Sequence, residues 1–273
     1  MTLVVQVGDP PPLDADDRPV FHQPDVLIRS GPPHGTLTLS WERAPALAEI
    51  APGTQTARVT LSRLAVARLQ ECTCTFFMAV LIFLLRRAGW HHVHAGTAID
   101  PAGRGWLIAG DSGAGKSTTA ALFASHGWQV GTDDATFLAP AGAQVAAVAY
   151  RAPIALRPDA QRALGRSGGI PVAGRRKAAY WPEDLGGRWA PKVEPEIVAF
   201  TSVGEGPTRA ARLGARAALA QLVRWSAWVV LEPDLAQEHL DLLARLARQA
   251  RSYRVSLGPD LFTDVAGLPD LVR

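Results

Sequence analysis

The sequence has few lysines and no dense run of basic residues. Of its 28 basic residues only three are lysine, Lys116, Lys177 and Lys192, and the others are arginine. The formal net charge is +3, and the arginines are scattered along the chain. Scattered arginine is typical of solvated surfaces, whereas arms that bind nucleic acid carry blocks of like charge. We therefore expect no nucleic-acid partner.

Cysteines and long apolar runs are also scarce. The two cysteines, Cys72 and Cys74, cannot complete a four-ligand zinc site, and cysteines this close rarely form an unstrained disulfide. The longest apolar run, residues 76–85, is well short of the ~20 residues that span a membrane. The N-terminus shows no basic start followed by an apolar core, so we expect no signal peptide. These features predict reduced thiols, no membrane partner and a cytoplasmic protein.

The composition is that of a globular protein, with 48% hydrophobic and 19% charged residues in a chain of 273. A chain of this length can bury a sizeable core, as one large domain or two smaller ones. Proline and glycine punctuate residues 1–62, with short strand-like segments between them. We expect a small β-rich N-terminal region over residues 1–62. A second domain over residues 63–273 would open with a helix that ends near residue 87.

The second domain mixes strand and helix patterns, which predicts an α/β fold. An Asp-Pro-Ala-Gly turn at residues 100–103 predicts a hairpin whose second strand is 105–109. Residues 162–192, rich in glycine and arginine, are expected to form a loop. The other expected elements are helices at 116–126, 214–230 and 233–250 and strands at 128–134, 196–203 and 253–257.

The segment between strand 105–109 and helix 116–126 matches the phosphate-binding pattern G-x-x-x-x-G-K-[ST]. Its glycines allow successive backbone N–H groups to turn toward phosphates, and the following helix points its positive end at them. Lys116 would reach the terminal phosphates of a nucleotide, and the Ser117 hydroxyl would ligate Mg²⁺. The candidate nucleotide-binding residues are Gly110, Asp111, Ser112, Gly113, Ala114, Gly115, Lys116, Ser117 and Thr118.

A phosphate loop alone does not name a reaction, but an acidic pair, Asp133 and Asp134, follows the next predicted strand. In phosphoryl transfer, one carboxylate could hold the Mg²⁺ that neutralises charge, and the other could remove the proton of an acceptor hydroxyl. The alternative is a pair that only caps or turns the chain. No L-S-G-G-Q-like stretch of transporter ATPases and no N-K-x-D-like guanine-reading run occurs. ATP and GTP are not separated by any motif.

In these motifs the chain resembles the kinase domain of HPr kinase/phosphorylase and its relatives. The relatives include HPr-kinase-like serine kinases of peptide-modifying clusters, such as those for lasso peptides. The shared features are a His-Ala strand, a hairpin, G-D-S-G-x-G-K-S, a short helix ending in Gly-Trp, and the Asp pair, all within residues 93–138. The first sixty residues do not carry the resemblance. Thr118 stands where the family commonly has Glu, and the family's glycine-rich phosphorolysis signature is not found.

The resemblance implies a P-loop kinase core in a mixed sheet, related to that of phosphoenolpyruvate carboxykinase. It implies that Asp133 is the general base, that Asp134 supports Mg²⁺ and that His94 lies beside the active site. Without the resemblance, His94 on an apolar strand could equally be a packed core histidine. Arg157 lies in a region where the family has arginines, and we expect it to face the phosphates and act with Lys116 in catalysis.

Other residues near these motifs have two interpretations or a structural one. The basic run at residues 175–177 could be a lid that lays a charge on the transferring phosphate, or a solvated loop. His91 and His92 are expected at the surface, where the strand begins. Trp225 and Trp228 are expected to pack in a helical core.

We expect an ATP- and Mg²⁺-dependent kinase that phosphorylates a hydroxyl, a serine in a protein or peptide. Two alternatives remain open: a kinase of free serine or a sugar, and a nucleotide-binding regulatory protein without turnover. A closed pocket under residues 162–192 would favour a small acceptor, and an open groove would favour a peptide. The N-terminal region could recognise a substrate or form the contact surface of a homo-oligomer.

Overall fold

The computed structural model describes residues 1–14, 16–31, 35–173 and 175–272. The chain divides into two compact units, Met1–His91 and His92–Arg273, and each is a mixture of helices and strands. The division therefore falls later than residue 62, where we expected the β-rich region to end. The reason is that the helices after residue 62 pack against the strands of the first unit.

The first unit is built on a sheet in which β1 pairs in parallel with β6 and the other neighbours are antiparallel, in the order β1-β6-β5-β4-β3-β2. Alternate residues of its central strands point to a buried face, which includes Val26, Ile28 and Leu39. The strands are β1 (Thr2–Val7), β2 (Arg18–Gln23), β3 (Val26–Ser30), β4 (Leu37–Trp41), β5 (Ala46–Ile50) and β6 (Thr56–Leu61). The β-rich character expected from the proline and glycine punctuation is thus present.

A nearly continuous helical segment follows β6. Ser62 caps it, because its hydroxyl oxygen accepts a hydrogen bond from the Ala65 backbone N–H at 3.2 Å. Its parts are α1 (Arg63–Ala67), α2 (Leu69–Cys72), the π-helical turn η1 (Thr73–Phe77) and α3 (Met78–Arg86).

The helix expected here, ending near residue 87, is present, and its apolar stretch is longer than the run 76–85. Residues Leu69–Arg86 form 18 helical residues with mean hydropathy 1.6, long and apolar enough to cross a membrane by length and composition alone. The sequence argument counted only the uninterrupted apolar run 76–85. Buried Phe76, Val80 and Phe83 show the pattern of a core helix, which passes the same test.

The second unit holds a larger mixed sheet in the order β16-β11-β10-β7-β8-β17-β19-β18, with β9 paired to both β7 and β15. Strands β8, β17 and β19 run parallel, whereas β7 is antiparallel to β8 and β9. Its strands are β7 (His91–Ile99), β8 (Gly105–Ala109), β9 (Gln129–Thr132), β10 (Ala135–Ala141), β11 (Gln144–Ala149), β15 (Arg188–Trp189), β16 (Lys192–Val193), β17 (Pro195–Val203), β18 (Arg209–Leu213) and β19 (Arg251–Leu257).

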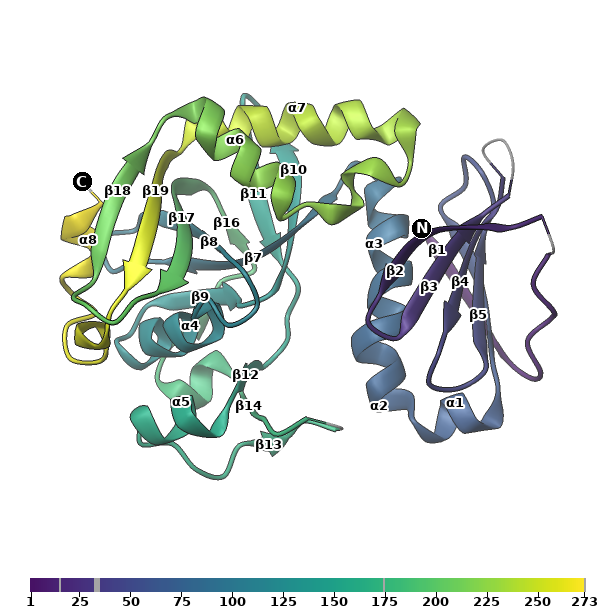
Figure 1. Cartoon of the computed structure of the whole chain (residues 1–273), viewed down its shortest axis with the longest axis horizontal. Helices are drawn as coiled ribbons and strands as arrows, with labels where there is room; N and C mark the ends of the chain where they lie inside the picture. The colour runs from purple at the N-terminus through teal and green to yellow at the C-terminus, as the bar shows by residue number, and fades with distance from the viewer. Residues whose placement is uncertain (15, 32–34, 174, 273) are drawn as a thin grey trace. The chain divides into compact units, whose positions relative to one another are not determined.

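Both faces of the large sheet are covered, as Figure 1 shows. Leu107 and Ala109 of β8 pack toward α6 and α7, whereas Trp106 and Ile108 pack toward α4 on the other face. The helices are α4 (Lys116–Ser125), α5 (Pro158–Ala163), α6 (Ala215–Arg224), α7 (Pro233–Gln249) and α8 (Leu268–Leu271). The 3-10 turns are η2 (Pro182–Leu185), η3 (Ala227–Val230) and η4 (Pro259–Phe262).

Two predicted elements of the second unit differ from the structure. The helix expected at 214–230 ends at Arg224, and a separate 3-10 turn follows it. The region 162–192, expected as a loop, contains short strands and η2. Two of its strands join one from outside it in a small sheet of β12 (Ile154–Leu156), β14 (Ala178–Tyr180) and β13 (Ile170–Pro171), in that order.

Candidate functional site

Strand β7 brings the two sequence motifs together. Its residue Ala95 lies opposite Ala109, the last residue of β8, and its residue Thr97 lies opposite Thr132, the last residue of β9. Because β8 and β9 are both antiparallel to β7, they end at the same edge of the sheet. The glycine-rich segment after β8 and the acidic pair after β9 are therefore neighbours in space.

The segment 110–115 between β8 and α4 needs glycine at two positions for its backbone. Gly113 and Gly115 have φ values of +87° and +88°, a left-handed conformation that other residues rarely adopt. At Gly115, which caps α4, a Cβ atom would also lie 2.9 Å from Leu257 Cδ1. The strand, turn and helix expected from the phosphate-binding pattern are all present, and Asp111, Ser112 and Gly113 are exposed on the turn.

Lys116 begins α4 with its side chain folded over the turn. Its Nζ donates hydrogen bonds to the carbonyl oxygens of Gly110, at 2.7 Å, and Asp111, at 3.2 Å. Burial lowers the pKa of this ammonium, and the carboxylates of Asp134 and Asp133 act in the opposite direction. A buried cation held only by carbonyl groups at the mouth of the turn can exchange them for an anion such as phosphate.

Asp133 is 7% exposed, and its carboxylate lies beside the Ser117 hydroxyl at the start of α4. Burial, together with the negative charge of Asp134, raises the pKa of Asp133 to about 6, and the Ser117 hydroxyl only partly offsets this. A carboxyl group whose pKa lies this close to neutral pH is suited to accept a proton.

Asp134 is held differently. Its Oδ1 lies 2.8 Å from His94 Nδ1, and 65% of its side chain is exposed. Loss of hydration raises its pKa, but the hydrogen bond and charge of His94 outweigh this and bring the pKa to about 2. The two adjacent carboxyl groups thus have well-separated pKa values, so one can remain an anion while the other exchanges a proton.

Because Gly96 of β7 has no side chain, the backbone of Thr132 and Asp133 can pack directly against it. A Cβ atom on Gly96 would lie 2.9 Å from the Thr132 carbonyl oxygen and 3.2 Å from Asp133 Cα. We expect Gly96→Ala to lower the free energy of unfolding by about 1–3 kcal/mol, since backbone on both strands must move. Urea denaturation would measure it. Gly206→Ala is the matched control, because nothing lies within 4 Å of that position, and equal stability of the two variants would contradict the prediction.

Two more cations lie beside the glycine-rich turn. Arg157 Nη2 is 3.8 Å from the position that a Cβ on Gly113 would occupy, so this guanidinium lies next to the turn. Arg224, at the end of α6, lies 3.2 Å from the Asp111 carboxylate and over the ring of Trp225. No sequence signal pointed to Arg224, because 113 residues separate it from Asp111.

The structure corrects the expectations for His91 and His92 and refines the one for Trp225. His91 and His92 were expected at the surface but are buried, and His92 packs against Phe137 and Trp228. Burial lowers the pKa of His92 to about 4, so it is neutral at physiological pH. Trp228 is buried as expected. Trp225 is only partly buried and lies beside the His94 ring, with centroids 6.4 Å apart.

The donor set suits a magnesium nucleotide. The Ser117 hydroxyl and the carboxylates of Asp133 and Asp134 supply the oxygen atoms that Mg²⁺ prefers, and Mg²⁺ usually takes one or two carboxylates with phosphates and water. Among the described residues no group of three or more His, Cys, Asp or Glu could hold a metal by itself.

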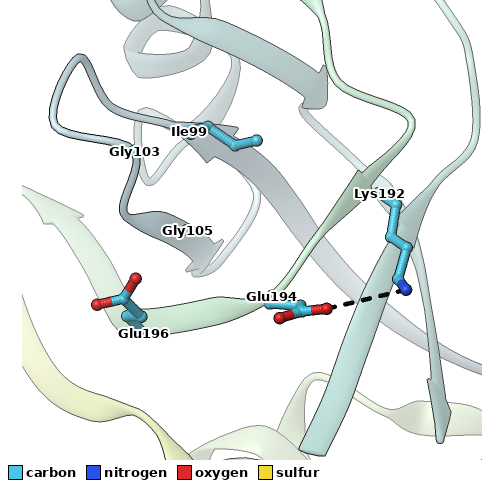
Figure 2. Close-up of a pocket in the computed structure, with 6 residues that line it drawn as sticks. All are labelled: Ile99, Gly103, Gly105, Lys192, Glu194 and Glu196. Carbon is cyan, nitrogen blue, oxygen red and sulfur yellow. Dashed lines mark ion pairs between the residues drawn. The ribbon is translucent and has the colours of Figure 1, made fainter. Parts of the chain in front are cut away.

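A separate pocket lies at the opposite end of β8 (Figure 2). It contains an ion pair between Lys192 and Glu194, 3.9 Å apart, and it is lined by Ile99, Gly103, Gly105, Lys192, Glu194 and Glu196. Gly105 begins β8, whereas the glycine-rich turn follows its last residue. The pocket is therefore separate from the candidate site.

Comparison with known proteins gives distant structural similarity without a match in sequence. No protein-family model and no curated protein sequence matches the chain. Among solved structures, the Hpr(Ser) kinase/phosphatase from Coxiella burnetii is similar with a TM-score of 0.36 and 13% identity. That similarity covers 66% of this chain and 94% of the other. At this level it does not assign a family, and the site must be judged from its own chemistry.

Proposed function

We propose that this protein is a kinase that uses ATP and Mg²⁺ to phosphorylate a hydroxyl group, a serine of a protein or peptide. The observation that carries the proposal is the position of Ser117, at the end of the glycine-rich turn, beside the buried carboxylate of Asp133. It joins a motif suited to phosphates with a group suited to accept a proton.

The residues have distinct roles in this proposal. The backbone N–H groups of the turn, Lys116 and Arg157 bind the phosphates and orient the terminal one. Ser117 and Asp134 would hold Mg²⁺, which when bound neutralises negative charge on the phosphates. His94 keeps Asp134 ionised. The Asp133 carboxylate takes the proton from the acceptor hydroxyl as that oxygen attacks.

The exposure of the site favours a large acceptor. More than half of the side chains of Asp134 and Asp111 are accessible to solvent, and Arg157 is exposed as well. A site with an open rim can admit a serine carried on a peptide, whereas a small acceptor is generally enclosed. We therefore place the peptide kinase ahead of a kinase for free serine or a sugar.

The test is acceptor-dependent ADP release combined with mass detection of the added phosphate. The panel holds serine-bearing peptides, an HPr protein and free serine, each with ATP or GTP. We expect a gain of about 80 Da, the mass of one added HPO₃ group, on a serine peptide, and no gain in reactions that contain Lys116→Met. Transfer to free serine alone would replace the acceptor class. Tight nucleotide binding without transfer to any acceptor would favour the regulatory protein.

A further inference from the structure

The small sheet carries two cations at one of its ends. Strands β12 and β14 are antiparallel, and Leu156 pairs with Ala178 at the last position of their ladder. Arg157 directly follows Leu156, and Lys177 directly precedes Ala178. The two residues therefore lie at the same end of the sheet, on neighbouring strands.

This end of the sheet faces the glycine-rich turn. Ile154, Leu156 and Tyr180 belong to the same buried core as α4, the helix that begins at Lys116, so the small sheet is packed against that helix. Arg157 reaches the turn beside Gly113. A residue at the same end of the neighbouring strand is within reach of the same anion.

Lys177 differs from the two arginines that precede it. Arg175 and Arg176 are exposed, whereas Lys177 is half-buried. Its backbone is fixed on both sides, because its carbonyl oxygen accepts from Val172 N at 3.1 Å and its N–H donates to the Arg175 carbonyl at 2.9 Å. Among the residues that the structure describes, its ammonium group forms no hydrogen bond or ion pair.

The charge of Lys177 acts on the two central groups of the site. It lowers the pKa of Asp133, and it lowers that of Lys116 by repulsion. Two ammonium groups that approach the same region repel each other unless an anion lies between them. Since Asp133 would receive the proton of the attacking hydroxyl, a cation whose charge reaches both Asp133 and Lys116 lies on the side of the site that the terminal phosphoryl group would occupy.

We propose that Lys177 binds the terminal phosphoryl group of the nucleotide, across the site from Lys116. This inference rests on the proposed kinase function and identifies a further ligand of its transferred group. In this role Lys177 only donates hydrogen bonds to phosphate oxygens, so it adds no proton-transfer step. Of the basic run at residues 175–177, only Lys177 has this role.

The small number of lysines allows a direct test. Limiting acetic anhydride labels Lys116, Lys177 and Lys192 to extents that peptide mass spectrometry reads separately. We expect ADP to protect Lys116 only, and β,γ-imido ATP to protect both Lys116 and Lys177. Lys192, at the opposite end of β8, should be labelled equally in all samples.

The possible results separate the inference from the function on which it rests. Protection of Lys116 without any extra protection of Lys177 by the triphosphate would overturn the inference and leave the nucleotide site intact. Labelling of Lys116 that no nucleotide changes would overturn both. Protection of Lys177 by ADP to the same extent as by the triphosphate would overturn the assignment to the terminal phosphate.

Variants give a second measurement that does not depend on turnover. By calorimetry, Lys177→Gln should bind β,γ-imido ATP about 10–100-fold more weakly, the usual effect of losing a charged hydrogen bond. Its affinity for ADP should change by less than about 2-fold. Lys177→Arg should recover most of the triphosphate affinity, and Lys192→Gln should match the wild type. Equal weakening of both nucleotides in Lys177→Gln would indicate a structural effect and contradict the inference.

Discussion

Asp133→Asn is expected to lower the rate of phosphate transfer by about 10²–10⁴-fold while leaving nucleotide affinity within a few fold of the wild type. The amide has nearly the same shape as the carboxyl group and still offers an acceptor oxygen to the neighbouring Ser117 hydroxyl, so we expect the local geometry to be retained. It cannot take a proton from the acceptor hydroxyl. Single-turnover transfer and calorimetric nucleotide binding, measured on the same preparation, would separate the two effects.

The same substitution should stabilise the protein without nucleotide or metal. In the folded state the pKa of Asp133 is raised from 3.8 to about 6, so the native state binds this proton more tightly than the unfolded state. The free energy of unfolding should therefore fall as pH rises from about 4 to about 6, and remain lower above that range. Asparagine removes this loss, which corresponds to as much as about 3 kcal/mol at pH 7.

The control for both effects is Asp241→Asn, an exposed carboxylate on α7 that should change neither transfer nor stability by much. Denaturation in EDTA at pH 4 and pH 7 would show whether the gain of Asp133→Asn appears only at the higher pH. A variant that transfers phosphate at the wild-type rate would remove Asp133 as the base. If Asp133→Asn were no more stable than the wild type at pH 7, the prediction that the buried Asp133 carboxylate destabilises the protein would be wrong.

Lys116→Met is expected to weaken nucleotide binding by at least about 100-fold, because the ammonium makes charge-assisted bonds to the terminal phosphates in our proposal. Methionine retains most of the buried volume of the lysine stem. Without nucleotide the variant should be at least as stable as wild type, since burial of the charged ammonium is unfavourable.

Thermal denaturation with and without nucleotide would measure the loss of nucleotide binding. Nucleotide at 100 times its Kd should stabilise the wild type by about 2.7 kcal/mol, and the same concentration should leave Lys116→Met almost unchanged. Lys192→Met, in the separate pocket of Figure 2, should respond like the wild type. If nucleotide stabilised Lys116→Met as much as it stabilises the wild type, the glycine-rich turn would not be the phosphate site.

Local chemistry was readable where adjacent residues decide the conformation. The turn at 100–103 forms as predicted, because the Asp100 carboxylate accepts hydrogen bonds from the backbone N–H groups of Ala102 and Arg104. The turn between β8 and α4 was also readable, because its left-handed backbone at Gly113 and Gly115 requires glycine. Ser62 begins the helical segment for a similar local reason.

Predictions were wrong where distant parts of the chain decide the environment. His91 and His92 are polar residues at the start of a strand, yet both are buried, and His92 packs against Phe137 and Trp228, which lie far along the chain. The helix expected at 214–230 stops at Arg224, and Ser226 is then buried with its hydroxyl donating to the Leu222 carbonyl. Residues 162–192 were expected as a loop because they are rich in glycine and arginine, and the strands that form there are too short to show an alternating pattern.

The sequence by itself determined the glycine-rich turn, the lysine and serine that follow it, and the acidic pair at the end of a strand, because each depends on neighbours in the chain. Only the tertiary structure decided that these parts meet, through the pairing of β7 with both β8 and β9. It also decided the difference between the two carboxyl groups. Adjacent aspartates are equivalent in the sequence, but one is buried against Ser117 and the other is paired with His94.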